Sequence, residues 1–578
     1  MTTGALLLPF ALAWPVALAC LWLSRSFRRV GAPLAATMAL PALVLAFTAD
    51  TAFEVRAPGL FTSMALGLDA VGRPFLLLTA LLWTVVGFHA AAYMRDDPRR
   101  ASFTGFMLAT GTGNIGLTVA QDALSFYLFF ALMTFAAYGL VVHTRTTAAL
   151  RAGRIYIIMA VLGEALILAG LFAITALATD ATFAGVPEAY ARLAHPSLVA
   201  GALLLGFGVK AGIMPVHLWL PLAHPVAPVP ASALLSGAMI KAGVLGWLRF
   251  LPMGDVAFPG LGVAVIIAGA TATLFGAAVG VTQTDAKTVL AYSSISQMGF
   301  LTIGVGAMLV VPAAAPLLVL AVAAYAIHHA LAKAALFLAV GLVPVDAYRG
   351  RWWLVAAALP ALALAGAPLT SGAMAKDALK TALGDLPAPW TARIDLVLTA
   401  AAVGTTLLMA RYLASLLQTQ PRPDRLDPRR AAPWLLLVLL SAVAAVWLPR
   451  ALAPLGELPP AVQPHYIVAT LWPVLLGGIL AFSTILLVRT YPALTVATVP
   501  AGDIVAFLEL AAARARRSTA SLAAWHSQDR IAPLTAKAAT AARGAIDGTA
   551  RLVETMAAGP GLGAVLCVLA LLLFLALR

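Results

Sequence analysis

The stretch from Gly206 to Leu251 reads GFGVKAGIMPVHLWLPLAHPVAPVPASALLSGAMIKAGVLGWLRFL, and the rest of the chain is interpreted around it. Two lysines, Lys210 and Lys241, lie inside runs that are otherwise apolar. An ammonium group at bilayer depth costs about 2.5–3.5 kcal/mol on insertion scales, so such residues usually face a bundle interior or a wet cavity and mark an ion path. Pro215 and Pro221 are expected to break the helix that carries Lys210, because proline removes a backbone donor. A broken helix with a buried lysine is typical of transporters.

The composition is that of an all-α polytopic membrane protein. The 578 residues are 62% hydrophobic and 10% charged, and their mean hydropathy is +0.96. A spanning helix needs about 20 apolar residues. The sequence predicts about sixteen such helices, centred near Leu12, Leu40, Leu81, Leu108, Phe130, Glu164, Leu205, Met239, Ile267, Gln297, Ile327, Ala365, Thr405, Val438, Leu475 and Leu569.

The formal net charge of +14 indicates membrane topology and not a nucleic-acid partner. Alternate loops collect cations, as in Arg25, Arg28 and Arg29, whereas the opposite loops contain few. The positive-inside rule places the cation-rich loops in the cytoplasm. We therefore expect a multi-pass protein of the bacterial cytoplasmic (inner) membrane, with both termini on the outer side and no nucleic-acid binding.

An acidic residue lies at the centre of the sixth predicted span. Glu164 stands within RIYIIMAVLGEALILAGLF, where a carboxylate must be neutral, paired with a cation or in contact with water. Lys210 is its expected partner, and a proton could be held or released there when the pair forms or breaks. The alternative is a neutral carboxylic acid that is hydrogen-bonded to a neighbouring helix.

The eleventh predicted span carries a row of polar groups at helical spacing. Tyr325, His329 and Lys333 are four residues apart in AAYAIHHALAKAALFLAVG, so they share one helix face and could line a chain of water. The alternative is a hydrogen-bonded histidine with a lysine that snorkels to the interface. His328 points about 100° away from this face and is expected to be a packing or cavity residue.

A second interrupted helix follows five spans after the first. Gly366 and Pro368 precede Lys376 and Asp377 in LPALALAGAPLTSGAMAKDALK. This recurrence predicts an inverted repeat of five helices. Between the two interruptions, Ser293 and Ser294 are polar at bilayer depth, and we expect them to form interhelical bonds or to anchor water.

The predicted organisation has six parts. They are three N-terminal helices (1–101), the first repeat (102–251), the second repeat (258–418), two further helices (419–499), an alanine- and arginine-rich lateral helix (500–557) and a last span (558–578). The lateral helix is expected on the cytoplasmic side, either as a strut across a neighbouring subunit or resting on lipid headgroups. The returning last span favours the strut.

We expect no cofactor or metal in this chain. The letters GTGNIG, from Gly111 to Gly116, match a dinucleotide-binding fingerprint, but no strand precedes them and close helix packing is the better interpretation. Cys20 and Cys567 lie in different hydrophobic segments and have no metal-ligand spacing.

Four motifs carry a resemblance to a known family. They are the opening stretch, TDAKTVLAYSSISQMGF, HHALAKAALFLAVG and SGAMAKD. Together they resemble the antiporter-like subunits shared by respiratory complex I, Mrp-type cation/proton antiporters and membrane-bound hydrogenases, and the opening stretch is most similar to the hydrogenase-4 component B type. The resemblance extends from about Leu108 to Leu417, and the lateral helix with the last span resembles the large complex I member.

The resemblance implies a fourteen-helix core with two half-channels joined by a polar axis that carries protons. The implied proton-relay residues are Glu164, Lys210, His217, Lys241, His329, Lys333 and Lys376, with Tyr325, His328, Asp377, Ser293 and Ser294 in secondary positions. One position departs from the family, because Ala131 stands where its fifth helix has a glutamate. Glu164 is then the nearby acid that could act on Lys210.

The leading hypothesis is a proton-translocating membrane subunit of a multisubunit redox-driven pump, without a redox centre of its own. Iron-sulfur, flavin or nickel-iron groups are expected only in peripheral partner subunits, and the transported ion is expected to be the proton, with sodium left open. The alternatives are a subunit of an Mrp-type antiporter without electron transfer and a degenerate subunit kept as a scaffold.

Overall fold

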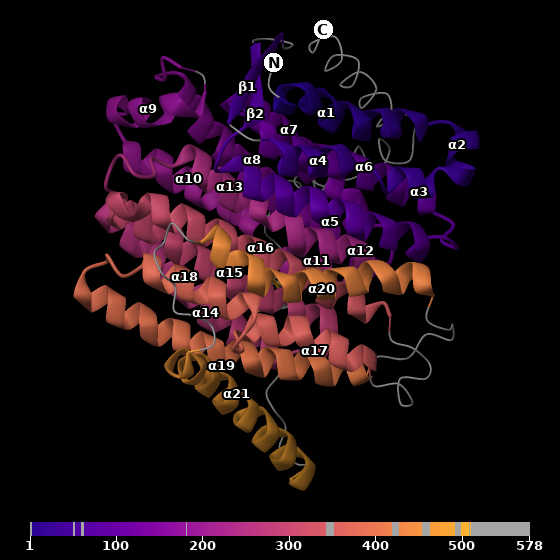
Figure 1. The fold of residues 1–578 in the computed structure, drawn as a ribbon, viewed down its shortest axis with the longest axis vertical. Helices are drawn as coiled ribbons and strands as arrows, with labels where there is room; N and C mark the ends of the chain where they lie inside the picture. The colour runs from indigo at the N-terminus through magenta and orange to yellow at the C-terminus, as the bar shows by residue number, and fades with distance from the viewer. Residues whose placement is uncertain are drawn as a thin grey trace, which may run out of the picture.

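The structure is a computed structural model that describes residues 3–49, 52–58, 63–180, 182–342, 352–418, 427–452, 463–491, 499–507 and 509. These residues form mostly helices, gathered side by side in one bundle from which α21 projects (Figure 1). Eleven of the described helices are long and apolar enough to cross a membrane, and three apolar helices are shorter. The chain is therefore a membrane-spanning protein, as predicted. The exact number of spans remains a prediction.

The N-terminal part contains an element that the sequence analysis did not predict. It consists of α1 (Thr3–Leu21), α2 (Arg25–Val30), α3 (Ala32–Ala35), α4 (Leu40–Thr48), β1 (Phe53–Pro58), β2 (Ser63–Leu68), α5 (Gly72–Tyr93) and α6 (Arg100–Val119). The two strands pair antiparallel, with Phe53 opposite Leu68. The described chain is mostly helical, as predicted, and this short hairpin is an addition to that fold class. The backbone N–H and C=O groups of a connection between helices need hydrogen-bond partners. Two strands of the same connection can supply them to each other.

The helix that carries Lys210 breaks as predicted. The elements are α7 (Ala123–Val141), α8 (Thr147–Thr175), η1 (Phe183–Gly185), α9 (Val186–Arg192), α10 (Pro196–Ala211), α11 (Leu220–Val226), α12 (Val229–Leu234), the π-helical turn η2 (Leu235–Met239) and α13 (Ile240–Phe250). Gly212 ends α10 with φ at +72°, a left-handed conformation that glycine adopts without strain. Pro215 lies in the break, whereas Pro221 stands near the start of α11, where its missing donor is harmless.

The second interruption is also present. The remaining elements are α14 (Pro259–Val281), α15 (Ala286–Val310), η3 (Pro312–Ala314), α16 (Ala315–Val340), α17 (Trp352–Ala365), α18 (Ser371–Ala382), α19 (Ala388–Gln418), α20 (Pro428–Ala451) and α21 (Pro464–Thr490). Gly366, with φ at +86°, ends α17, and Pro368 lies between α17 and α18. The division into two inverted repeats remains a prediction, as do the other part boundaries.

The first fifteen predicted helix centres all lie within helices or the π-helical turn. The sixteenth, Leu569, and most of the predicted lateral helix (500–557) lie outside the described residues. The described segment 499–507 begins against the bundle, where Gln283 Nε2 donates a hydrogen bond of 2.9 Å to the Val499 carbonyl.

An ion pair between a buried arginine and a partly exposed aspartate joins the hairpin region to the end of α13. Arg249 Nη2 donates to Asp69 Oδ1 at 2.7 Å, and the Arg249 side chain is only 4% exposed. We expect Asp69→Ala to destabilise the protein by about 3 kcal/mol, because it leaves a buried guanidinium without its anion. Thermal unfolding of the purified protein in detergent measures this effect. Asp255→Ala, on an exposed loop, is the control and is expected to unfold like the parent protein.

Candidate functional site

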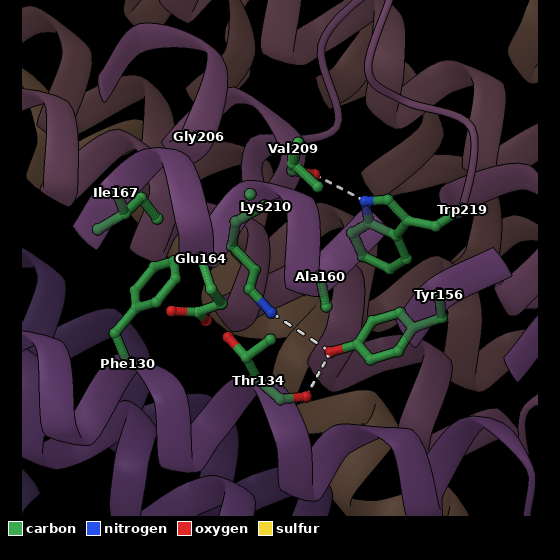
Figure 2. Close-up of a pocket in the computed structure, with 11 residues that line it drawn as sticks. Phe130, Thr134, Tyr156, Ala160, Glu164, Ile167, Gly206, Val209, Lys210 and Trp219 are labelled. Carbon is green, nitrogen blue, oxygen red and sulfur yellow. Dashed lines mark hydrogen bonds between the residues drawn. The ribbon is translucent and has the colours of Figure 1, made fainter. Parts of the chain in front are cut away.

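The Lys210 ammonium lies in a small cavity between α7, α8 and α10 (Figure 2). Its Nζ donates to Tyr156 Oη at 3.3 Å, and Tyr156 Oη donates to the Thr134 carbonyl at 2.7 Å. The Phe130 and Tyr156 ring centroids lie 5.6 and 5.5 Å from Nζ, within the range of cation–π attraction. Lys210 also stands in the last turn of α10, where the helix dipole favours a cation.

Close approach of α8 and α10 brings Glu164 to the same cavity. A Cβ added to Gly206 would lie 2.9 Å from the Gly163 carbonyl oxygen, so these two small residues let the backbones meet. Glu164 lines the cavity with Lys210, but neither of its carboxyl oxygens has a hydrogen-bond partner among the described residues. The expected pair is thus brought together without a direct ion pair. The cavity volume is about 10 Å³, which is about the room that one water needs.

The sequence analysis missed Tyr156, although its spacing was a usable signal. Tyr156 precedes Glu164 by two helical turns and so lies on the same face of α8. Phe130 and Thr134, one turn apart on α7, line the cavity, whereas Ala131 is not among the lining residues. The carboxyl group beside Lys210 therefore comes from α8, as the substitution at Ala131 led us to expect.

The central contact joins α13 to α16. Lys241 Nζ lies 2.5 Å from His329 Nδ1 and donates to the Ser236 carbonyl at 2.6 Å. Lys241 is 1% exposed and His329 is fully buried. Ser236 belongs to the π-helical turn η2, a local irregularity that often marks functional sites. Two predicted relay residues that are far apart in the sequence are therefore in direct contact.

The neighbouring polar groups extend from this contact along α15. Lys333 Nζ donates to the Leu290 carbonyl at 2.8 Å, so this lysine points to α15 and makes no hydrogen bond to His329. Ser294 Oγ lies 2.8 Å from Ser236 Oγ, which confirms an interhelical bond for this serine. Ser293 Oγ has no hydrogen-bond partner among the described residues.

Tyr325 and His328 of α16 form hydrogen bonds with two different helices, α15 and α18. Tyr325 Oη donates to Gln297 Oε1 at 2.6 Å, so the tyrosine faces α15. His328 Nδ1 lies 2.9 Å from the hydroxyl of Ser371, the first residue of α18. His328 therefore contacts the break after α17, a position that its sequence alone did not reveal.

Lys376 is held by the break itself. Its Nζ donates to the carbonyls of Leu364 and Ala365, at 3.0 and 2.8 Å, which are free because α17 ends there. A cavity of about 130 Å³ adjoins it, with Asp377 and Tyr466 in its lining and room for several waters. The lysine at the second interruption thus adjoins a larger cavity than the lysine at the first.

His217 lies at the connection between α10 and α11 and points to a partner that the sequence analysis did not name. His217 Nε2 is 3.1 Å from Asp503 Oδ2, and Tyr292 Oη donates to the same oxygen at 2.7 Å. No sequence signal pairs these residues, because 286 positions separate the histidine from the aspartate.

The candidate groups form separate clusters within the part of the chain that the structure describes. No hydrogen bond there joins the Lys210 cluster to Lys241, or Lys241 to Lys376. Proton transfer between them would need water. The described ranges also contain no group of three or more histidine, cysteine or acidic side chains placed to hold a metal ion.

Residues 120–400 match the family described as NADH:quinone oxidoreductase/Mrp antiporter, transmembrane. Hydrogenase-4 component B of Escherichia coli is 30% identical over 298 residues, which cover 49% of this chain and 44% of the relative. NAD(P)H-quinone oxidoreductase chain 4 of Picosynechococcus is 31% identical over 256 residues, covering 43% of this chain and 46% of the relative. The chain thus spans about half the length of these curated relatives.

Two solved structures have a similar fold. The Mrp complex from Dietzia gives a TM-score of 0.70 at 23% identity, with 93% of this chain and 63% of that chain covered. The archaeal membrane-bound sulfane sulfur reductase gives a TM-score of 0.65 at 22% identity, with 86% of each chain covered. The family match and the curated relatives confirm the resemblance inferred from the sequence motifs, and the two solved structures show a similar fold.

Proposed function

We propose, from the match of residues 120–400 to an antiporter-type transmembrane family, that this chain translocates protons as a membrane subunit of a multisubunit redox-driven pump. The contact between Lys241 and His329 is the observation that carries this proposal. Two buried basic groups at 2.5 Å cannot both be charged without strong repulsion, so they share a proton or pass it on.

The proposed path begins at Glu164 and Lys210, continues through Lys241 to His329 and Lys333, and ends at Lys376. Each lysine beside a helix break adjoins a cavity, which supports proton exchange with water at both ends of the row. Because the charges lie in a medium of low dielectric constant, a proton arriving at one group favours its release from the next. His217, Tyr325, His328 and Asp377 would orient or supply the connecting waters.

The proposal extends to the assembly. The segment 500–557 would contact other membrane subunits from the cytoplasmic side of the bacterial inner membrane, with both termini outside. Peripheral subunits would hold the iron-sulfur, flavin or nickel-iron groups, and this chain would hold none. The ion would be the proton, although competition by sodium is a separate outcome of the experiment below.

The test is to purify the full-length protein from its native membranes with the subunits that accompany it. The complex is then reconstituted in vesicles that contain a pH-sensitive dye. Acidification or alkalinisation that depends on electron transfer supports the redox-driven pump. Proton movement that follows an imposed sodium gradient, in a complex without redox groups, would instead establish an antiporter.

Two variants test whether the chain itself carries the protons. We expect Lys210→Met and Lys376→Met each to reduce proton transport by at least about tenfold, because each removes the titratable group at one helix break. Arg192→Met, at the exposed end of α9, is the control. Normal transport by both lysine variants would favour the scaffold interpretation.

A further inference from the structure

Asp503 is a buried carboxylate contributed by a segment far from the relay in the sequence. It is 2% exposed, and its Oδ2 atom lies 3.1 Å from His217 Nε2 and 2.7 Å from Tyr292 Oη. The histidine comes from the break after α10, and the tyrosine comes from α15, the helix that also supplies Ser294 and the Leu290 carbonyl to the central lysines. Asp503 therefore joins the break after α10 and the helix α15 to the segment 499–507.

Other contacts fix this segment in place. Val499 accepts a hydrogen bond from Gln283 Nε2 at 2.9 Å and donates its N–H to Thr282 Oγ1 at 3.4 Å. Gly502 has φ at +86°, and a Cβ there would meet the Leu222 side chain at 2.7 Å. A glycine before Asp503 lets the backbone turn tightly against α11, so that the carboxylate reaches His217.

The surroundings keep Asp503 ionised. Burial tends to raise the pKa of its carboxyl, but the hydrogen bond and charge of His217 and the hydrogen bond from Tyr292 outweigh burial and hold the pKa below the usual 3.8. The folded protein therefore gains stability from this carboxylate at neutral pH and loses it only as the pH falls through the lowered pKa. The imidazole also contacts Phe275 of α14, whose ring centroid is 5.5 Å away and which does not titrate.

The carboxylate also determines which histidine nitrogen can take a proton. Asp503 accepts a hydrogen bond from Nε2, so a neutral His217 carries its hydrogen on Nε2 and keeps the lone pair on Nδ1. His217 Nδ1 is buried and has no hydrogen-bond partner among the described residues. In this tautomer Nδ1 is a hydrogen-bond acceptor that can take up a proton.

We propose that Asp503 is a positioning residue for proton transfer at His217, and that it couples this step to the docking of the segment 499–507 on the broken helix. The inference rests on the proposed function. A proton passes from water to Nδ1, the imidazolium keeps its Nε2–H bond to the carboxylate, and the proton leaves again from Nδ1 to the next water. No bond is made or broken other than these N–H bonds, and Asp503 remains ionised throughout.

The test uses Asp503→Asn in the full-length protein within its native complex, reconstituted in vesicles. Asparagine keeps the shape but lacks the charge that stabilises protonated His217. We expect proton transport to fall about tenfold. We also expect the pH dependence of transport to change, because asparagine removes the anion that accepts the hydrogen bond from His217 Nε2. Asp503→Glu restores the carboxylate and is expected to restore the pH profile at least in part.

A purely structural role predicts a different result. Hydrogen exchange of the backbone amides in 499–507 would then increase in Asp503→Asn while the pH profile kept the shape of the parent protein, and that result would overturn the proposal. Asp255→Asn, on an exposed loop, controls for the loss of a carboxylate elsewhere.

A second variant covers the case in which Asp503→Asn does not assemble. His217→Gln keeps an N–H donor for Asp503, so the segment stays docked, but it has no basic nitrogen. About tenfold lower transport is expected, and transport at the level of the parent protein would reject the role of this pair. If Lys241→Met is inactive while His217→Gln is not, only the present inference fails. If neither variant has an effect, the proposed function fails with it.

Discussion

Lys241→Met is expected to abolish proton transport by the reconstituted complex. The lysine is 1% exposed, and its Nζ touches His329 Nδ1 at 2.5 Å and the Ser236 carbonyl at 2.6 Å. Methionine fills a similar volume without a titratable group, so the central contact between α13 and α16 is lost while the packing is kept. A loss of at least about tenfold corresponds to about 1.4 kcal/mol or more in the barrier.

Lys241→Arg separates the need for a charge from the need for a mobile proton. A guanidinium group keeps the positive charge but does not release its proton in proteins. If Lys241 passes a proton to His329, the arginine variant will be as inactive as the methionine variant. If Lys241 only supplies a fixed charge, the arginine variant will transport protons and the relay proposed for this residue is wrong.

The measurement is the initial rate of dye response in vesicles that contain equal amounts of assembled complex. Arg192→Met serves as the control, because Arg192 lies exposed at the end of α9 and pairs with Glu188 of the same helix. Electron transfer is measured in the same preparations. Its persistence without proton transport would show that Lys241→Met uncouples an intact complex. Transport by Lys241→Met at the rate of the control would remove the central observation behind the proposed function.

Gly269→Val is expected to destabilise the folded bundle by about 3 kcal/mol or more. Helices α14 and α15 meet through glycines on both sides, and a Cβ at Gly269 would lie 2.7 Å from the Gly299 carbonyl oxygen. The reverse contact is as close, because a Cβ at Gly299 would lie 2.5 Å from the Gly269 oxygen. Since backbone atoms are the obstacle, the helices must separate, and α15 would carry Tyr292 and Ser294 away from their partners.

Size-exclusion chromatography and thermal unfolding in detergent measure this effect. Gly260→Val is the matched control on the same helix, because a Cβ at Gly260 meets nothing within 4 Å. It introduces the same β-branched side chain and is expected to behave like the parent protein. Equal stability of the two variants would mean that the close contact between α14 and α15 is not required.

The sequence alone determined the membrane class, the helix positions and the two breaks. Lys210, Lys241 and Lys376 could be identified because an ammonium group is incompatible with lipid, whichever helices surround it. The break near Gly212 was predictable in the same way, since proline and glycine act on their own stretch of backbone. Such signals need no knowledge of the partner across the bundle.

Only the tertiary structure decided which groups meet. The spacing of His329 and Lys333 predicted that they share a face of α16. It could not show that His329 contacts Lys241 or that Lys333 contacts α15. Asp503 carried no signal, because its burial against His217 depends on a contact over 286 positions. The physical reason is that helix geometry is set by hydrogen bonds within a few residues, whereas contacts between helices depend on how their whole surfaces pack.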